Sequence, residues 1–382
     1  MFAGKRKPGN AGNIAHGYAK IRKRDDEDDD EQANGFGDDA EVEEEDFPST
    51  AEQENDQIAG PEQYDTSERW SRPVPPALNA SADELVFQLV DVDFYEDVDD
   101  GTVGLRPVVR LFGVTEAENS VCCRLTGFLP YFYAAAPEGF GPELLDRFQA
   151  AVDRAILSNE YRSAKGLKKA CLNVELVRGE SIYGYNHQRK LNFLKVTVAL
   201  PRLITPTRKI LESGAFECEG IPSNRKNLAS YEANLDFEIR FMVDMNVTGC
   251  CWIRLLPGKY RLIQDRGAFL SRCQLETVCD CSKPDDPPFI AEAPEGKWGH
   301  VAPLRILSFD IECAGRRGVF PEFDQDPVIQ IANIVQRQGD SEPAVKNVFV
   351  LNACAPLVGA QINCFRKETD LLQVMCPGLS IC

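Results

Sequence analysis

Apolar positions recur along the chain after about residue 69 in patterns that predict both strands and helices. Residues 142–157 place Leu, Phe, Val and Ile at helical spacing, and residues 194–200 alternate apolar with polar side chains before Pro201. The first pattern predicts an amphipathic helix and the second a half-buried strand. Further strands are predicted at residues 84–95, 108–112, 122–134 (with an irregularity at Pro130) and 248–256, and short helices at residues 207–217 and 237–243. Strands that alternate with a few helices indicate an α/β, or mixed α+β, fold.

Residues 280–299 interrupt these patterns because they are polar and rich in proline, which predicts a domain boundary. Three strand candidates follow the boundary, at residues 304–311, 328–335 and 345–351. Short turn-rich segments join them, so we expect an antiparallel meander. The sequence therefore predicts one mixed domain over residues 69–299 and a second domain over residues 300–382.

Charge separates residues 1–68 from the rest of the chain. The formal net charge is −18, and residues 25–68 alone contain 20 acidic residues and no Lys or Arg. A segment so charged and so poor in apolar residues is expected to be a disordered tail. Its first part carries basic clusters at Lys5, Arg6, Lys7, Lys20, Arg22, Lys23 and Arg24. These clusters predict a nuclear localisation signal, and the alternative is a solvated basic tail.

The 14 cysteines are interpreted as reduced thiols of a nuclear or cytosolic protein. Several of them stand inside apolar runs, and the chain lacks a signal peptide. Cys279 and Cys281 are spaced like metal ligands, but two thiols without a second pair are more often free than bound to zinc. No apolar stretch is long enough to span a bilayer, so we expect a soluble protein with no membrane partner.

The strongest candidate for chemistry is the pair Asp310 and Glu312. Residues two apart in a strand project to the same face, so the two carboxylates stand side by side while Phe309 and Ile311 anchor the opposite face. Adjacent carboxylates repel each other, and hard oxygen ligands suit Mg²⁺ or Mn²⁺. The alternative is the solvated face of an ordinary strand. The apolar flanks favour a metal site because they predict a central strand, where charged side chains need a reason.

Other candidates are weaker. His187 and His300 stand far apart without ligand spacing, so ordinary core or surface positions are expected. The basic pairs Arg189-Lys190 and Arg316-Arg317 could contact phosphate, although exposed basic pairs are common. The chain contains no phosphate-loop, HExxH or GxSxG motif.

Residues 304–322, LRILSFDIECAGRRGVFPE, resemble the first exonuclease motif of the replicative B-family DNA polymerases, in particular those of the delta type. Residues 326–333, DPVIQIAN, resemble the same family. So do residues 231–244, YEANLDFEIRFMVD, and the stretches at 107–115 and 127–133. The similarity extends over roughly residues 69–373, which is too long for a chance match of motifs.

The resemblance implies a ribonuclease-H-like 3′→5′ exonuclease domain that starts near residue 300 and proofreads the primer end. Asp310 and Glu312 would be two of its four carboxylates, binding two catalytic Mg²⁺ ions, and Glu312 would also orient the attacking water. The earlier residues would form the N-terminal domain that cradles the DNA. The family further implies a DNA primer–template, accessory polymerase subunits and a sliding clamp as partners, nucleotide binding and nucleotidyl transfer in replication and repair, and a nuclear location.

The resemblance stops after residue 373, where the chain reads VMCPGLSIC. The other two exonuclease carboxylates and the polymerase motifs are not found, which suggests an altered splice or gene model. We therefore expect this chain itself to be inactive in polymerisation and excision. The alternative function is that of a truncated, non-catalytic isoform that binds DNA or a partner. A stand-alone nuclease is disfavoured because two of the four carboxylates are missing.

Overall fold

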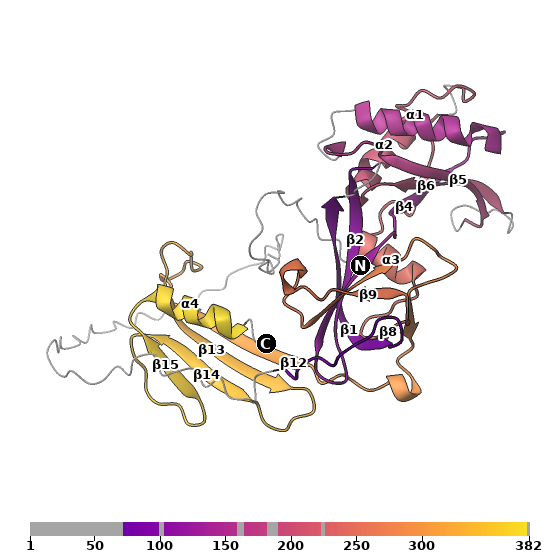
Figure 1. The fold of residues 1–382 in the computed structure, drawn as a ribbon. Helices are drawn as coiled ribbons and strands as arrows, with labels where there is room; N and C mark the ends of the chain where they lie inside the picture. Colours follow the sequence, from indigo (N-terminus) through magenta and orange to yellow (C-terminus); the bar gives the residue numbers. More distant parts are fainter. Residues whose placement is uncertain (1–71, 99–102, 159–163, 182–189, 223–225, 380–382) are drawn as a thin grey trace, which may run out of the picture. The chain divides into compact units, whose positions relative to one another are not determined.

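The computed structural model describes residues 72–98, 103–158, 164–181, 190–222 and 226–379. These residues all belong to one unit of the chain, and Figure 1 shows their fold. The fold is mixed α/β, with three separate sheets and a few helices. None of the helices within the described ranges is long and apolar enough to cross a membrane.

The first sheet has seven strands in the order β11-β8-β1-β2-β3-β10-β9. Their bounds are β1 Leu85–Val98, β2 Leu105–Val114, β3 Ser120–Thr126, β8 Trp252–Leu255, β9 Tyr260–Leu262, β10 Leu275–Asp280 and β11 Phe289–Glu292. All pairings are antiparallel except that of β3 with β10. Apolar side chains of one face, such as Leu111 and Ile253, pack with Phe237 and Phe241 of helix α3, Phe237–Asp244. Burying this face stabilises the long β1–β2–β3 meander.

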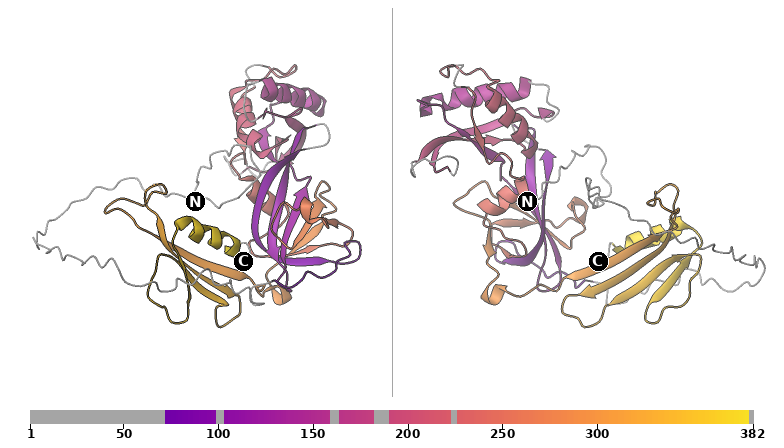
Figure 2. Two further views of the ribbon diagram at one scale, coloured as in Figure 1. Left: turned by 60° about the vertical axis from the view of Figure 1, so that its left-hand side comes forward. Right: turned by 180° about the vertical axis from the view of Figure 1, so that it is seen from behind.

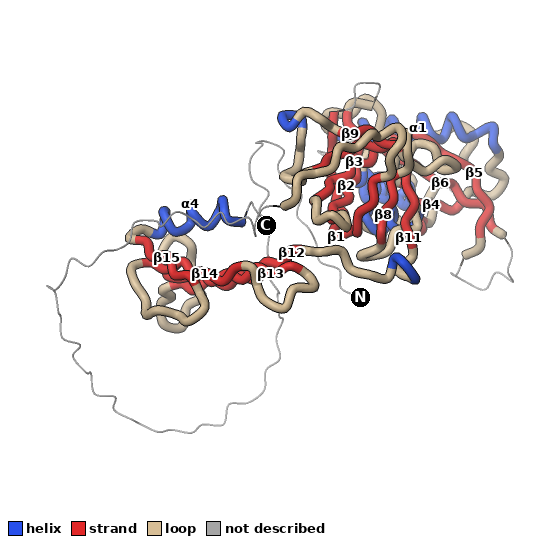
Figure 3. The backbone as a smooth tube through the Cα atoms, turned by 60° about the horizontal axis from the view of Figure 1, so that its bottom comes forward, coloured by secondary structure: helices blue, strands red, loops and turns tan. Residues whose placement is uncertain are grey.

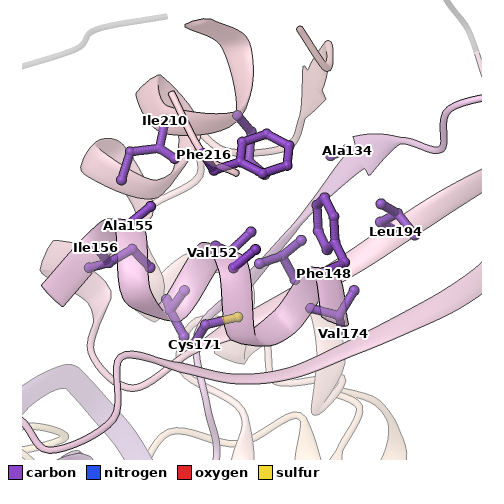
Figure 4. Packing of buried hydrophobic residues seen from close by; sticks show 14 of the residues in the cluster. Ala134, Phe148, Val152, Ala155, Ile156, Cys171, Val174, Leu194, Ile210 and Phe216 are labelled. Atoms are coloured by element: carbon purple, nitrogen blue, oxygen red, sulfur yellow. The ribbon is translucent and has the colours of Figure 1, made fainter. Parts of the chain in front are cut away.

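The second sheet has the order β5-β6-β4-β7 and is antiparallel throughout. Its strands are β4 Tyr131–Ala135, β5 Cys171–Gly179, β6 Leu191–Val198 and β7 Ser230–Tyr231. Helices α1, Leu145–Ser158, and α2, Ile204–Ser213, lie together on one face (Figures 1 and 2). Phe148 of α1 is fully buried in this core, where its ring meets that of Phe216 edge-on (Figure 4). It makes a second edge-on contact with the ring of Phe140.

The third sheet has the order β12-β13-β14-β15. Its strands are β12 Arg305–Cys313, β13 Val328–Arg337, β14 Val345–Leu351 and β15 Gln361–Phe365. The first three strands are antiparallel neighbours, which confirms the predicted meander, and β15 joins β14 in parallel. Helix α4, Glu368–Leu379, lies along one face of this sheet (Figure 3). Its Leu371 packs with Ile331, Phe349 and Phe365 in a small core.

Most predicted elements are confirmed with shifted ends, and one is wrong. The strand predicted over residues 122–134 is two strands, β3 and β4, which belong to different sheets. Gly127 adopts a φ of 86° between them, and Pro130 has no N–H to donate to a ladder, so the strand cannot continue. The strand predicted over residues 248–256 shrinks to β8, because Cys250 turns with a φ of 57°. The helix predicted over residues 207–217 begins and ends earlier, at α2, because Gly214 caps it in the left-handed conformation.

The proline-rich segment 280–299 is more structured than a linker. It contains β11, which pairs with β8 of the first sheet, and a single 3₁₀ turn at Gly296–Trp298. The segment that follows also contacts this sheet, since Ala302 is fully buried against Val114 and Trp252. The first sheet thus holds the chain almost to the start of β12.

Candidate active site at the carboxylate strand

Strand β12 carries both candidate carboxylates on one face, as strand periodicity requires. Asp310 lies opposite Ala332 of β13 and Glu312 lies opposite Gln330. The regular pairing ends directly after Glu312, where the register shifts before Cys313. The pair therefore stands at the last regular positions of the strand, next to the loop that leads to β13.

The expectation that β12 is a central strand is wrong. In the described part of the third sheet, β12 is an edge strand whose only neighbour is β13. Phe309 and Ile311 do point away from the carboxylates, but they remain 51% and 43% exposed. Ile311 pairs with Ile331, so Phe309 and Ile311 point to the same face of the sheet as the core under α4. They stay exposed because α4 packs mainly over β14 and β15. An apolar run in the sequence does not distinguish a central strand from an edge strand with an uncovered face.

Both carboxylates are exposed, and among the residues that the structure describes no Lys, Arg or His forms an ion pair with either of them. Asp310 accepts a hydrogen bond from the amide of its neighbour Ile311, at 3.0 Å. Four carboxylate oxygens without a cationic partner are a donor set that suits Mg²⁺ or Mn²⁺. Over the described ranges no third His, Cys, Asp or Glu joins them to form a group of metal ligands. The residues present therefore fit part of a hard-metal site.

The loop between β12 and β13 is held by Arg316. Its guanidinium reaches both oxygens of Asp326, at 3.2 and 3.1 Å, as well as Glu322 and Gln325. Asp326 is 4% exposed and also accepts a hydrogen bond from the Glu322 amide, at 2.8 Å. That amide and the Arg316 guanidinium lower the pKa of Asp326. Arg316 thus has a structural role that the sequence did not reveal, since residues ten apart in the sequence, as it and Asp326 are, are not neighbours within any regular element. Arg317 is exposed.

Cys279 and Cys281 form no metal site with other described residues, and both are free thiols. Cys279 instead lies 3.6 Å from the sulfur of Cys123, and both are buried in the first sheet. Burial raises the pKa of Cys281 to about 12, so this thiol is protonated at neutral pH. Cys250 also stands in an apolar stretch of the sequence, but it is exposed because it occupies a turn.

His300 has the surface position expected of it. Its ring stacks on Trp252 and bonds to Glu116 at 2.9 Å. Lys190 is exposed. The remaining predictions lie outside the described residues: His187, Arg189 and the basic residues Lys5, Arg6, Lys7, Lys20, Arg22, Lys23 and Arg24.

The sequence is similar to known proteins over most of its length. The family model for the DNA polymerase family B exonuclease domain matches residues 228–378, and that for the DNA polymerase delta catalytic subunit-like N-terminal domain matches residues 127–205. The DNA polymerase delta catalytic subunit of Drosophila melanogaster is 45% identical over 320 residues, which cover 82% of this chain and 29% of that protein. The chain is homologous to the N-terminal region of DNA polymerase delta catalytic subunits.

Other delta catalytic subunits give the same result. That of Bos taurus is 46% identical over 314 residues, 80% of this chain and 27% of the relative. The chain therefore spans a little more than a quarter of the length of the delta subunits that it matches. A solved family B DNA polymerase from Pyrobaculum calidifontis aligns with 70% of this chain and 27% of its own, with 23% sequence identity and a TM-score of 0.48.

The two family matches fall on different parts of the fold. The delta N-terminal match covers strands β4, β5 and β6 of the second sheet and helix α1, which packs on it. The exonuclease match begins at residue 228, includes α3 and β8, and contains the whole of the third sheet. Asp310 and Glu312 lie inside it.

Proposed function

We propose that this chain is the N-terminal part of a replicative DNA polymerase and that Asp310 and Glu312 act in its 3′→5′ proofreading exonuclease. One observation carries the proposal: within the match to the exonuclease domain, two exposed carboxylates without a described cationic partner stand side by side on β12. The sheet that bears them, an antiparallel meander followed by a parallel strand and a helix, is consistent with the start of a ribonuclease-H-like domain.

In the proposed reaction Asp310 and Glu312 hold Mg²⁺ on the open side of β12. Mg²⁺ held there would supply activation of a water molecule and stabilisation of the oxygen that leaves the phosphodiester. Glu312 stands nearer the loop and would orient the attacking water. Ala332 and Gln330, which lie opposite the two acids on β13, carry no charge. The remaining ligands must come from residues outside the described set.

The broader proposals follow from the family. The substrate is a primer–template whose 3′ end carries a mismatch, and the family context adds accessory subunits, a sliding clamp and a nuclear location. The basic residues between Lys5 and Arg24 are the proposed nuclear localisation signal.

A second function, a DNA- or partner-binding module without catalysis, is favoured by the small donor set. Two carboxylates on an exposed strand bind a divalent cation weakly, because each ion would keep most of its water. For this chain on its own, we therefore propose metal binding without measurable excision.

The test is Mn²⁺ binding, followed by electron paramagnetic resonance of free Mn²⁺ during titration of the purified chain. We expect weak binding that is lost in the Asp310→Ala/Glu312→Ala variant and retained in Asp324→Ala/Glu342→Ala, a control that removes two other exposed acids. The proposal is wrong if both double variants bind Mn²⁺ as the unaltered chain does. Excision of a labelled primer by the isolated chain, lost in the first variant, would instead rule out the non-catalytic reading.

A further inference from the structure

The turn between β2 and β3 holds Glu118 in a backbone conformation that residues other than glycine rarely adopt. Glu118 has a φ of 66°, in the left-handed region where a side chain costs energy. Its amide bonds to Thr115, at 3.0 Å, and its carbonyl accepts from Arg72, at 2.9 Å. Both main-chain groups of Glu118 are thus hydrogen-bonded, and these bonds hold the backbone from which its side chain projects.

That side chain contacts both strands that begin the third sheet. Its carboxylate lies 2.7 Å from Arg337 of β13 and 3.6 Å from Arg305, the first residue of β12. Arg305 and Arg337 are directly opposite each other in the β12–β13 ladder. Like charges in opposed positions destabilise a strand pair, so a carboxylate shared by both arginines offsets their repulsion. The side chain of Arg305 is only 8% exposed, which limits screening of this contact by solvent.

A second set of contacts holds the segment just before β12. The buried Gln88 of β1 accepts a hydrogen bond from the Ala302 amide at 2.7 Å and donates one to the Cys250 carbonyl at 3.0 Å. The indole of Trp252 donates to the His300 carbonyl at 3.1 Å. We name the whole set the junction clasp; its members are Gln88, Glu118, Trp252, Ala302, Arg305 and Arg337.

We propose that Glu118 is a positioning residue, which through the junction clasp fixes the direction in which β12 leaves the first sheet. Five residues after Arg305 the strand presents Asp310, and two later Glu312. β12 is held at its first residue by an ion pair. The backbone just before it accepts hydrogen bonds from side chains of the first sheet and donates to them, so the strand has little freedom to pivot. The clasp itself stands on these contacts, while its consequence for excision rests on the proposed function of the two carboxylates.

Glu118→Gln isolates this role. Glutamine keeps the length of the side chain and leaves the turn backbone as it is, but it removes the charge that the two arginines share. Asp340→Asn is the matched control. Asp340 is the other acid on Arg337, at 2.9 Å, and it belongs to the same hairpin as Arg337, so its loss does not touch the junction.

Two measurements report the clasp without metal or DNA. Amide exchange at Ala302 and along β12 should be about two- to fivefold faster in Glu118→Gln, the range that an ion pair of this kind supports, and nearly unchanged in Asp340→Asn. Peptides from β5 and β6 should exchange as before, which separates local release from global unfolding. In an Arg337→Gln background, Glu118→Gln should add less, because the two residues then no longer interact.

The second measurement is a distance. Cys250 and Cys354 are exposed thiols beside the first and third sheets, and with the other non-buried cysteines replaced by serine they accept one spin label each. The distance distribution between the labels should broaden in Glu118→Gln and stay narrow in Asp340→Asn. Equal distributions and equal exchange in all variants would overturn the proposal. Loss of Mn²⁺ binding in Asp310→Ala/Glu312→Ala with an unchanged label distance keeps the two proposals distinct.

Discussion

The carboxylates of Asp310 and Glu312 are available to bind a cation, because no described Lys or Arg forms an ion pair with either of them. Strand periodicity alone predicted that they share a face, since a spacing of two residues admits no other arrangement in a strand. Their exposure was not predictable in the same way. It depends on which strand lies beside β12 and on where α4 packs, and both are decided by residues distant in the sequence.

Asp326 shows the opposite case, an acid whose importance the sequence did not reveal. Its carboxylate is almost completely enclosed by the loop and accepts from the Glu322 amide and the Arg316 guanidinium. These contacts depend on the folded loop, so no local pattern of residues predicts them. Arg316, which the sequence offered as a candidate phosphate ligand, instead holds this loop together through its bonds to Asp326, Glu322 and Gln325.

The loop should therefore respond to acid. The pKa of Asp326 is lowered by the Glu322 amide and by Arg316, so its folded-state pKa lies below its unfolded value. Its contribution to the order of the loop is then complete above the unfolded pKa and is lost as the pH falls through the folded pKa. We expect the amide resonance of Glu322 to shift with pH at values below the usual range of an aspartate.

Asp326→Asn should have the altered Glu322 resonance already at neutral pH and show no such transition. Asp324→Asn, which changes an exposed acid two residues earlier, should behave as the unaltered chain does. A Glu322 resonance that titrates in the same way in all three proteins would show that Asp326 does not hold the loop.

Among the elements, α1 is the one that the sequence predicted best. Its apolar residues recur at helical spacing, and Phe148, Val152 and Ile156 are all fully buried in the second-sheet core. Strands were predicted less well because a strand needs partners. Residues 122–134 read as one strand, yet Gly127 and Pro130 divide them between two sheets. Periodicity identifies a buried face but does not say which sheet will bury it.

Phe148→Ala tests the packing of α1. The ring is completely buried between Phe140 and Phe216, and truncation leaves a cavity that the surrounding sheet can fill only in part (Figure 4). We expect a loss of about 3–5 kcal/mol in the free energy of unfolding. Chemical denaturation followed by circular dichroism measures it. Arg154→Ala, on the exposed side of the same helix, should cost less than about 0.5 kcal/mol. Equal costs would mean that α1 is not packed as described.

At the scale of the whole molecule, the first sheet is the element that connects the others. It contributes β8 and β11 on one side of β1, and through Gln88 and Glu118 it holds the chain that enters β12. The sequence indicated a boundary within residues 280–299 from its prolines, but it could not show that β11 would pair with a strand more than thirty residues earlier. The division into domains at residues 69–299 and 300–382 remains a prediction.

The central claim is that Asp310 and Glu312 are metal ligands in the active site of a proofreading exonuclease. Its most direct test uses a polymerase that carries these residues as its N-terminal part and compares excision of a mismatched primer terminus with extension of a matched one. Asp310→Ala/Glu312→Ala should reduce excision by at least about a hundredfold, because ligands of the reacting metal are lost, and leave extension within about twofold. Undiminished excision in that variant, or an equal loss of both activities, would contradict the claim.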